Sequence, residues 1–363
     1  MRVLVTGDRG YIGAVMVPFL RGAGHVVDGL DTGLYEGCDL LGGPEPIGDR
    51  KPRDMRDVTA KELEGYDAVV CLAALSNDPL GNLDKEATYS VNLRGTLNVA
   101  QAAKDAGVER FLFASSCSLY GAAGSEAVGE DAEMFPVTAY GETKALAEQE
   151  LSKLADDNFS PTYLRNATAY GASTRLRLDI VVNNLTAIAL TTGQVRLESD
   201  GTPWRPLVHI EDISRAFGEV LESPRDVIHD EAFNVGRSED VVQVRDIAEM
   251  VREVVPGSTL SIADGAGPDL RNYKVDFSKL NDTFPGLKLE WTVRKGVEEM
   301  YDAYQRHGLT YDDFTSAQFV RLRRIQQLLD KNLVDSQLVR QTDEQFPGPK
   351  ADFFFENKST EAN

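Results

Sequence analysis

Cysteine is scarce in this chain of 363 residues, which contains only Cys38, Cys71 and Cys117. Their odd number and the absence of C-x-x-C spacing indicate neither a disulfide framework nor a zinc cluster. We therefore expect no metal ion, and a reducing cytoplasm fits this cysteine content best. Long apolar runs are also missing. A membrane-spanning helix needs about 20 residues, and no apolar run approaches that length. The sequence thus predicts a soluble protein without a cleaved leader or a membrane partner.

Basic residues are fewer than acidic ones, at 38 against 58, which gives a formal charge of -20 at pH 7. A charge of this sign repels polyphosphate backbones and anionic membrane surfaces, so nucleic acid is not an expected partner. An anionic substrate would need a locally basic site, so the arginines in the second half of the chain are candidate ligands for it. Hydrophobic residues make up 42% of the chain, enough for the substantial core of a globular protein.

Short β-rich runs alternate with longer helical patterns through the first half of the chain. The runs cover residues 2–6, 25–31, 67–73 and 110–116, and the clearest helical spacings cover residues 89–106 and 140–154. Residues 161–171 fit another buried strand that ends in a loop. Such alternation is typical of β-α-β units on a parallel sheet. We predict an α/β fold with a Rossmann-type doubly wound parallel sheet and a smaller, mixed α/β substrate-binding lobe.

The pattern changes after residue 165, where helices, short strands and Gly/Pro turns mix. We expect a dinucleotide-binding domain over residues 1–165 with return segments at about 203–237, an interleaved substrate-binding lobe over 166–310, and a C-terminal helical extension and tail over 311–363. In the extension, apolar residues from Phe319 to Leu333 have helical spacing, with arginines on the opposite side. That helix packs on its own domain or forms a subunit contact. The cluster Phe353–Phe355 in the polar tail indicates a docking segment.

A glycine-rich loop directly follows the first predicted strand. TGDRGYIG at residues 6–13 places Gly7, Gly10 and Gly13 in G-x-x-G-x-x-G spacing just before a helical pattern, with Tyr11 and Ile12 between the last two. The glycines let the backbone approach a pyrophosphate, and the following helix directs free N–H groups at that charge. The loop therefore predicts a dinucleotide site.

Asp31 stands at the end of the second predicted strand, 18 residues past Gly13. A carboxylate there accepts hydrogen bonds from the adenosine ribose and repels a 2′-phosphate, and residues 32–35 offer no cation to bind one. NAD is therefore the expected cofactor, although Arg9 in the glycine loop favours NADP. Further contacts with the cofactor are expected from five residues. Asp54 and Met55 suit the adenine edge, and Leu72, Ala73 and Ala74 form a surface of small side chains against the dinucleotide.

Tyr140 and Lys144 place a phenol and an ammonium four residues apart, and therefore on one face of a helix. A phenol with an ordinary pKa of about 10 acts as a base at neutral pH only beside positive charge. The pair follows the glycine loop and a serine-rich strand end, Ser115 to Ser118. Over residues 1–307 this combination resembles the extended short-chain dehydrogenase/reductase superfamily, in particular its nucleotide-sugar epimerase and dehydratase branch, with UDP-glucose 4-epimerase among its members.

The resemblance implies catalytic roles for three residues. In that family a tyrosine is the acid/base, a lysine lowers the pKa of that tyrosine and binds the nicotinamide ribose, and a serine or threonine hydroxyl bonds the reacting sugar oxygen. These roles fall on Tyr140, Lys144 and Ser116. Asn92 and Ser115 would also contact the cofactor, although a helix-to-backbone hydrogen bond explains Asn92 equally well.

A nucleoside-diphosphate sugar is the substrate that the resemblance implies. The residues expected around it are Ser116, Cys117, Ser118, Thr168, Asn184, Arg205, Asp269 and Arg271. Arg205 and Arg271 would bind the diphosphate as charge-assisted donors, and Asp269 would take the nucleoside ribose. Arg175 and Arg177 are further cations, for which a solvated charge pair is as good an interpretation.

The family's reactions begin with oxidation of a sugar carbinol to a ketone, usually at C4, and differ in the fate of that ketone. Dehydratases that resemble this chain carry an Asp-Glu pair, and decarboxylases a Glu, where this sequence has Cys117 and Ser118. Without that carboxylate, we expect C4 epimerisation of an NDP-hexose or NDP-heptose. A 3/5-epimerase would use a cysteine, but alternation along the strand should point Cys117 away.

Other outcomes stay open at this point. They are a 4,6-dehydratase, a decarboxylase, a 4-ketoreductase, a 3/5-epimerase, or an NAD-sensing scaffold, although scaffolds of this fold typically lose the tyrosine or the lysine that this chain retains. We also expect a cytoplasmic homodimer.

Overall fold

The computed structural model describes residues 1–40, 51–76, 84–121, 126–262 and 272–349 of the chain. Its largest sheet has six strands in the spatial order β10-β6-β4-β3-β1-β2, and neighbouring strands are parallel throughout. The strands are β1 (Arg2–Thr6), β2 (Val26–Leu30), β3 (Ala68–Cys71), β4 (Arg110–Ser116), β6 (Ser160–Asn166) and β10 (Glu231–Val235). The order reverses between β1 and β3, which creates a crevice outside the carboxyl ends of these strands. This sheet confirms the predicted Rossmann-type fold.

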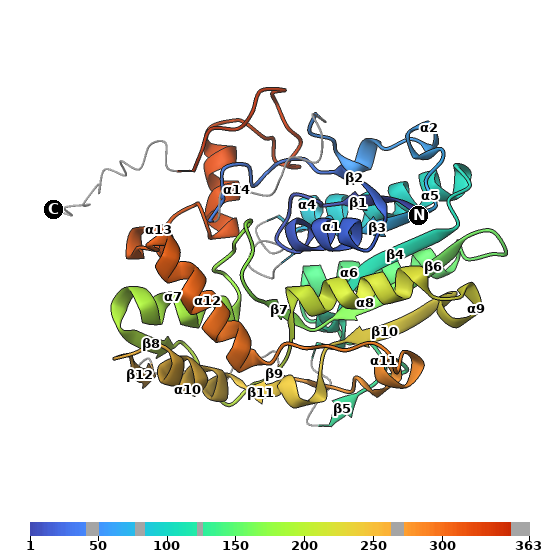
Figure 1. The fold of residues 1–363 in the computed structure, drawn as a ribbon. Coiled ribbons are helices and arrows are strands. Elements are labelled where there is room, and N and C mark those ends of the chain that lie inside the picture. The colour runs from blue at the N-terminus through green and yellow to red at the C-terminus, as the bar shows by residue number, and fades with distance from the viewer. Residues whose placement is uncertain (41–50, 77–83, 122–125, 263–271, 350–363) are drawn as a thin grey trace.

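Successive side chains along each strand enter two different cores, one on each face of the sheet. Leu112 and Ala114 of β4 lie in the core beneath α1 (Gly13–Gly22) and α8 (Ile210–Glu222). Phe111 and Phe113 lie in the opposite core, beneath α2 (Ala60–Leu63), α5 (Thr96–Asp105) and α6 (Ala139–Ser152). Figure 1 shows α1 and α8 side by side in front of the sheet. The continuous apolar runs of these strands follow from burial on both faces.

The predicted helix over residues 89–106 is present in two parts. After the single turn α4 (Lys85–Thr88), residues Tyr89–Gly95 form a π-helix, η2, and α5 continues from Thr96. A π-helix is wider than an α-helix and is found frequently at functional sites. Asn92 lies inside this wider segment and is 1% exposed.

The predicted strand over residues 161–171 is also divided, because the chain leaves one sheet for another at Ala167. Beyond it, β7 (Thr168–Tyr170) pairs with β9 (Trp204–His209), which also pairs with β11 (Val241–Gln243). These three strands form the sheet of the second lobe. The chain returns to the large sheet through α8 and β10, whereas β9 stays in the smaller one.

Three helices of the second lobe share one core, which also includes Tyr170, Leu207 and Phe319. They are α7 (Val181–Thr192), α10 (Val244–Val254) and α12 (Val293–His307). Two pairs of short strands lie at the edges, β8 (Gln194–Leu197) with β12 (Thr259–Ile262) and β5 (Ala127–Val128) with β13 (Lys274–Val275). Short helical turns complete the chain at η1 (Met55–Asp57), η3 (Cys117–Tyr120), α9 (Arg225–Ile228), η4 (Ser238–Asp240) and α11 (Ser278–Thr283).

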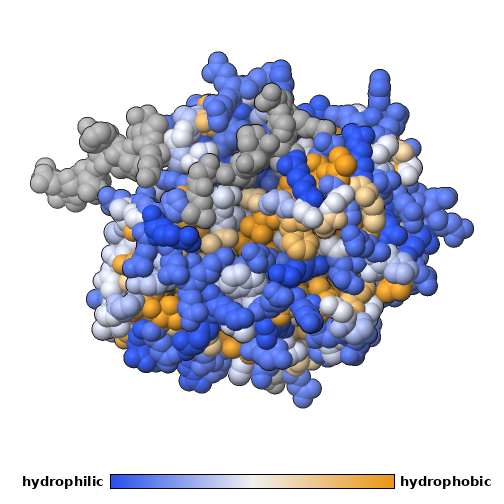
Figure 2. All heavy atoms as spheres, in the orientation of Figure 1, coloured by the Kyte–Doolittle hydropathy of each residue, from blue (hydrophilic) through white to orange (hydrophobic). Residues whose placement is uncertain are grey.

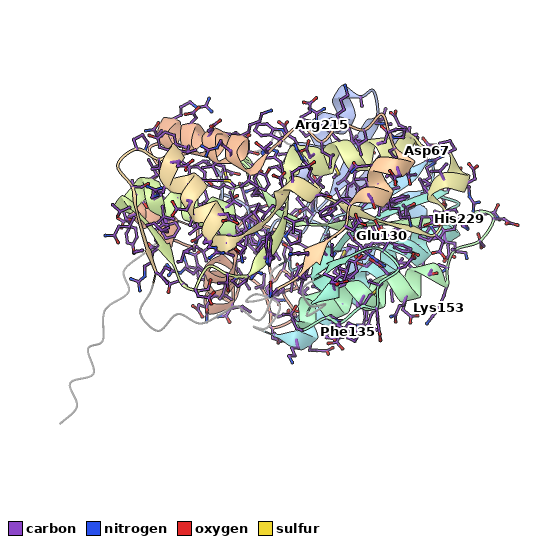
Figure 3. All side chains as sticks on the ribbon, turned by 90° about the horizontal axis from the view of Figure 1, so that it is seen from below. Asp67, Glu130, Phe135, Lys153, Arg215 and His229 are labelled. Carbon is purple, nitrogen blue, oxygen red and sulfur yellow. The ribbon has the colours of Figure 1, made fainter. Side chains whose placement is uncertain are left out.

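The amino ends of the parallel strands lie away from the second lobe. In Figure 3, Asp67, Lys153 and His229 mark this edge at the right of the view, and the residues precede β3, β6 and β10. Hydrophilic residues dominate the face drawn in Figure 2, and apolar residues gather near its middle. Within the described ranges, no helix has the length and apolar character to cross a membrane.

The C-terminal extension packs against the chain's own dinucleotide-binding half, as one of the two expected arrangements has it. It contains α13 (Tyr311–Thr315) and α14 (Arg321–Asp330), and Ile325 and Leu328 of α14 join a core cluster with Leu34 and Leu75. The expected placement of the arginines on the opposite, solvent-facing side of this helix is wrong for Arg321 and Arg324 and correct for Arg323, which is exposed. Arg321 and Arg324 are 4% and 1% exposed, because backbone carbonyls of neighbouring loops accept their N–H groups. The cluster Phe353–Phe355 lies outside the described residues.

Candidate active site

A cleft of about 780 Å³ opens at the crevice between β1 and β3 and continues between the two lobes. Most residues selected from the sequence line it: Gly7, Gly10, Tyr11, Ile12, Gly13, Asp31, Asp54, Met55, Leu72, Ala73, Ala74, Ser115, Ser116, Ser118, Tyr140, Lys144, Thr168, Asn184 and Arg205. Asn92 and Cys117 do not line the cleft. Asp269 and Arg271 lie outside the described residues.

The glycine loop packs so closely against neighbouring backbone that a side chain would not fit at Gly7 or Gly13. Gly7 has a φ of +74°, and a Cβ built on it would lie 2.8 Å from the backbone nitrogen of Ala73. A Cβ on Gly13 would lie 2.3 Å from the Gly7 carbonyl oxygen. Helix α1 begins at Gly13, and its N-cap residue Ile12 offers no side-chain cap to the first N–H groups. This cradle fits the pyrophosphate of a dinucleotide.

Asp31 lies at the end of β2 with both carboxylate oxygens facing backbone donors. The N–H of Gly33 donates to Oδ1 at 2.7 Å, and the N–H of Arg9 donates to Oδ2 at 3.3 Å. Burial raises the pKa of Asp31, while these hydrogen bonds and the charges of Arg175 and Arg9 lower it, and the net direction is upward. The Arg9 guanidinium, which favoured NADP in the sequence, lies 3.6 Å from Glu36, so a carboxylate already balances its charge.

Tyr140 and Lys144 share the first turns of α6, which Thr138 caps by accepting the Gly141 N–H. The Lys144 Nζ lies 5.8 Å from the centre of the Tyr140 ring and donates to the Ala114 carbonyl at 2.6 Å. The lysine is 2% exposed, and this burial lowers its pKa from 10.5 to about 8. At neutral pH the ammonium therefore remains mostly charged beside the phenol, as an acid/base tyrosine requires.

Ser116 lies at the end of β4 and caps the turn η3. Its Oγ accepts the Ser118 N–H at 3.2 Å, which orients the hydroxyl and leaves its proton available to a ligand. Ser118 also lines the cleft, and its buried Oγ has no hydrogen-bond partner among the described residues. Two serine hydroxyls therefore lie on the same wall as Tyr140.

Three predicted contacts have other partners in the structure. Asn92 accepts from the Leu75 N–H at 2.8 Å and donates to the Leu75 carbonyl, so it braces the loop after β3 from behind the cleft. The Ser115 hydroxyl donates to Glu148, a buried carboxylate of α6. The placement of Cys117 at the substrate is wrong, because its thiol points into the core, 3.1 Å from the Arg165 carbonyl, and burial raises its pKa. The expectation that Cys117 points away from the substrate is confirmed, although the residue begins the turn η3 and not a further position of the strand.

The substrate side of the cleft receives one predicted residue from each of three elements of the second lobe. Thr168 begins β7, Asn184 lies in the first turn of α7, and Arg205 lies in β9 with 7% exposure. The Asn184 side chain donates to the Leu178 carbonyl at 2.9 Å, and Arg205 donates to the Trp204 carbonyl at 2.9 Å.

Cations outnumber carboxylates around the cleft, in contrast to the whole chain. The described lining has four carboxylates, Asp31, Asp54, Asp179 and Glu198, against seven cations, Arg53, Arg56, Lys144, Arg177, Arg196, Arg205 and Arg321. The cleft is therefore locally basic, as an anionic substrate requires, but the sequence indicated only Lys144 and Arg205 of these cations as site residues. Arg177 is 6% exposed, so a solvated charge pair is not the correct interpretation of this residue. In the sequence it is one of many arginines, with no spacing to distinguish it.

A family model described as "NAD dependent epimerase/dehydratase family" matches residues 3–236. The chain belongs to this family. Membership confirms NAD as the cofactor and confirms the predicted resemblance. The family description and the presence of both Tyr140 and Lys144 in the cleft favour an enzyme over the alternative of a scaffold protein.

Named relatives carry out different reactions. UDP-glucose 4-epimerase from Bacillus subtilis is 26% identical, over 88% of this chain and 100% of its own. UDP-glucuronic acid decarboxylase 1 from Arabidopsis thaliana is 25% identical, over 86% of this chain and 72% of its own. The structure of UDP-glucuronic acid 4-epimerase from Bacillus cereus in complex with UDP-glucuronic acid and NAD has a TM-score of 0.73 and 25% identity, covering 84% of this chain and 99% of that one.

Replacing Lys144 with methionine should separate stability from activity. Because the folded pKa of about 8 is below the ordinary value of 10.5, burial of the charged form costs the NAD-free protein roughly 3 kcal/mol by the usual conversion of pKa shifts. Lys144→Met should therefore raise the free energy of unfolding at pH 7 by about 1–3 kcal/mol, while turnover falls about 100-fold or more. Urea unfolding and steady-state kinetics measure the two quantities.

The sign of this effect fixes its pH dependence. The penalty is complete below pH 8 and fades as the pH rises toward the pKa of the unfolded chain, so the stability difference should shrink above pH 8. Lys153→Met, at the exposed end of the same helix, is the control and should change neither quantity. A less stable Lys144→Met protein at pH 7 would contradict the assignment of a desolvated ammonium.

Asp31 should make the protein prefer NAD over NADP. We expect NAD to bind at least about tenfold more tightly, because the carboxylate repels a 2′-phosphate. Asp31→Asn should narrow that ratio, whereas Asp54→Asn, at the other cofactor-side carboxylate, should leave it unchanged. Calorimetric titration with each dinucleotide measures the ratio. Equal affinities in the unsubstituted protein would contradict the expectation and would indicate that the charge of Arg9 offsets the repulsion by Asp31.

Proposed function

We propose that this protein interconverts two nucleoside-diphosphate sugars that differ in configuration at C4. The observation that carries the proposal is the composition of the cleft wall. Tyr140, Lys144 and Ser116 are together there, and the described lining has no carboxylate on β4, η3 or α6 to drive elimination or decarboxylation. The fate left to a 4-keto sugar is then recapture of the hydride. The relatives support the substrate class, since several act on UDP-sugars.

The four described carboxylates of the cleft are each engaged by a neighbouring donor. Two lie on cofactor-side loops and two on the second lobe, and their partners are backbone N–H groups of Gly33 and Arg9 for Asp31, and the guanidinium groups of Arg56, Arg177 and Arg196 for Asp54, Asp179 and Glu198. Asp31 also follows β2, which β1 and β3 separate from β4 and its serines. Carboxylates with these partners and positions are poor candidates for taking up a proton from the sugar.

The chemistry assigned to the chain's own residues is proton transfer and orientation. The Lys144 ammonium stabilises Tyr140 as a phenolate, which takes the proton of the C4 hydroxyl as the C4–H bond breaks and becomes a phenol. The chemistry that bound NAD would supply is that of a reversible hydride acceptor at C4. The Ser116 hydroxyl donates to the C4 oxygen, and Tyr140 returns the proton to that oxygen when the bond to hydrogen forms again on the opposite face.

Epimerisation requires the sugar to present both of its faces. The diphosphate end would stay bound to Arg205, while the sugar turns in a part of the cleft lined by short side chains, Ser116, Ser118 and Thr168. Small hydroxyl side chains offer hydrogen bonds in either orientation without filling the space. The wall therefore suits a mobile intermediate better than a fixed one.

A sugar labelled at C4 tests the reaction. Incubation with UDP-glucose or UDP-glucuronic acid deuterated at C4, without added reductant, should give the C4 epimer with unchanged mass and with deuterium retained at C4. Mass spectrometry and proton NMR read the outcome. Loss of the mass of water or carbon dioxide would establish a dehydratase or a decarboxylase instead. Net consumption of NADH would establish a reductase, and solvent deuterium at C3 or C5 an enolising epimerase.

Replacing the acid/base separates chemistry from binding. Tyr140→Phe should lower turnover about 100-fold or more, the range for loss of general acid–base catalysis, and leave the affinity for NAD nearly unchanged. Tyr89→Phe, a phenol of the neighbouring η2, is the control. A Tyr140→Phe protein that keeps a tenth of the activity would remove Tyr140 from the mechanism.

A further inference from the structure

Two arginines line the cleft without complete partners and come from segments that the sequence did not assign to the cofactor. Arg177 belongs to the loop between β7 and α7 and is 6% exposed, and Arg321 begins α14 of the C-terminal extension and is 4% exposed. The Arg177 Nη1 donates to the Ser76 hydroxyl at 2.9 Å, and the Arg321 guanidinium stacks on the Tyr35 ring at 3.9 Å. Both side chains are therefore held in place by the loops that follow β3 and β2.

The two guanidinium groups carry more positive charge than their surroundings balance. Arg177 forms an ion pair with Asp179 at 2.7 Å, and no carboxylate among the described residues pairs with Arg321. Burial lowers the pKa of both, but Asp179 raises that of Arg177 above its ordinary value. The pKa of Arg321 stays lowered, with the charge of Arg177 adding to the effect of burial. Burial raises the pKa of Asp39 and the charge of Arg321 partly offsets this rise, but the ion pair of Asp39 is with Arg175 at 3.0 Å. Two half-buried carboxylates, Asp179 and Asp39, thus face the three buried guanidinium groups of Arg175, Arg177 and Arg321, an arrangement that favours an anion.

Each guanidinium also has an unused donor. The Nη2 of Arg177 and the Nη1 of Arg321 are buried and have no hydrogen-bond partner among the described residues. Burying an unpaired charged donor costs free energy, and such groups are normally satisfied by protein, water or ligand. An anion with several acceptor oxygens in the cleft would use both donors.

The neighbours of the two arginines belong to the cofactor side of the cleft. Tyr11 of the glycine loop donates to the Gly171 carbonyl at 2.7 Å and accepts from Asn183, whose side chain also donates to the Arg177 carbonyl at 3.1 Å. Ser76 and Tyr35 follow the strands that flank β1, and β1 leads into the glycine loop. The predicted diphosphate ligand of the substrate, Arg205, lies on β9 instead.

We propose that Arg177 and Arg321 bind the pyrophosphate of NAD, opposite the glycine loop, so that the C-terminal extension supplies part of the cofactor site. The backbone of the loop approaches the pyrophosphate from the large sheet, and the guanidinium groups approach it from the second lobe and from α14. The proposal depends on the cofactor and not on the reaction at C4, so it stands or falls separately from epimerase activity.

The diphosphate of the sugar nucleotide offers the same chemistry, and separate ligands distinguish the two. The test compares Arg321→Met with Arg323→Met, a change at an exposed arginine of the same helix. Affinities for NAD and for UDP are measured by calorimetry on NAD-free protein, and the unfolding midpoint of each variant is measured without ligand. Methionine keeps an unbranched, apolar side chain and removes the guanidinium and its charge.

Arg321→Met should weaken NAD binding by about tenfold or more, the loss expected for a buried charge-assisted contact, and leave UDP binding nearly unchanged. The unfolding midpoint without ligand should stay equal or rise, because a buried cation without a carboxylate partner is removed. Arg323→Met should match the unsubstituted protein. If Arg321 had only a structural role, Arg321→Met would lower the unfolding midpoint, and the folded fraction would bind NAD with unaltered affinity.

Two results would overturn the proposal. The first is an NAD affinity of Arg321→Met equal to that of the unsubstituted protein. The second is a loss of affinity for UDP alone, which would show that the two arginines bind the substrate. If Arg321→Met does not fold, Arg321→Lys is tested in its place. The retained charge should support folding, and the affinity for NAD should fall, because an ammonium lacks the planar fork of donors of a guanidinium. Unchanged affinity in a folded Arg321→Lys protein together with unchanged salt dependence of NAD binding would equally refute it.

Discussion

The backbone of the glycine loop is the feature on which the other parts of the structure converge. Its close approach to β3 leaves no space for a side chain at Gly7. From the other side, the Ser173 hydroxyl donates to the Tyr11 carbonyl at 2.9 Å, and Arg175 donates to the Arg9 carbonyl at 3.0 Å. The second lobe is thus bonded directly to the loop. The hydrogen bonds that shape the cofactor site also set the width of the cleft in which the sugar would lie.

Desolvation links the stability of the site to its chemistry. Lys144 is surrounded by the Phe113 ring, the Ala114 carbonyl and the Tyr140 ring, so few groups replace the water that its ammonium loses on folding. The same low polarity strengthens its interaction with a phenolate in the transition state. Behind it, Glu148 is held by Arg165 at 2.7 Å in a buried ion pair. That pairing keeps a nearby carboxylate from neutralising the lysine completely.

Features encoded by local spacing were predictable from the sequence, and features that depend on packing were not. The glycine spacing from Gly7 to Gly13 directly follows a strand and precedes a helix, and the Tyr140–Lys144 pair follows from the period of one helix. Asn92 and Ser115 lie where expected along the chain, but their hydrogen bonds go to Leu75 and Glu148. Which partner a buried polar group finds depends on elements that meet only in the folded chain.

The buried arginines show most clearly what local spacing cannot predict, because no local pattern in the sequence connects Arg177 with Arg321. Amphipathic spacing correctly indicates that α14 packs through Ile325 and Leu328, but it wrongly assigns Arg321 and Arg324 to solvent. A helix that covers a polar cleft buries cations as well as apolar groups, since carbonyls and anions can satisfy them. In a chain with a net charge of -20, a cleft whose described lining has seven cations and four carboxylates is a local reversal of the overall charge. That reversal lets an acidic protein bind two anionic molecules side by side.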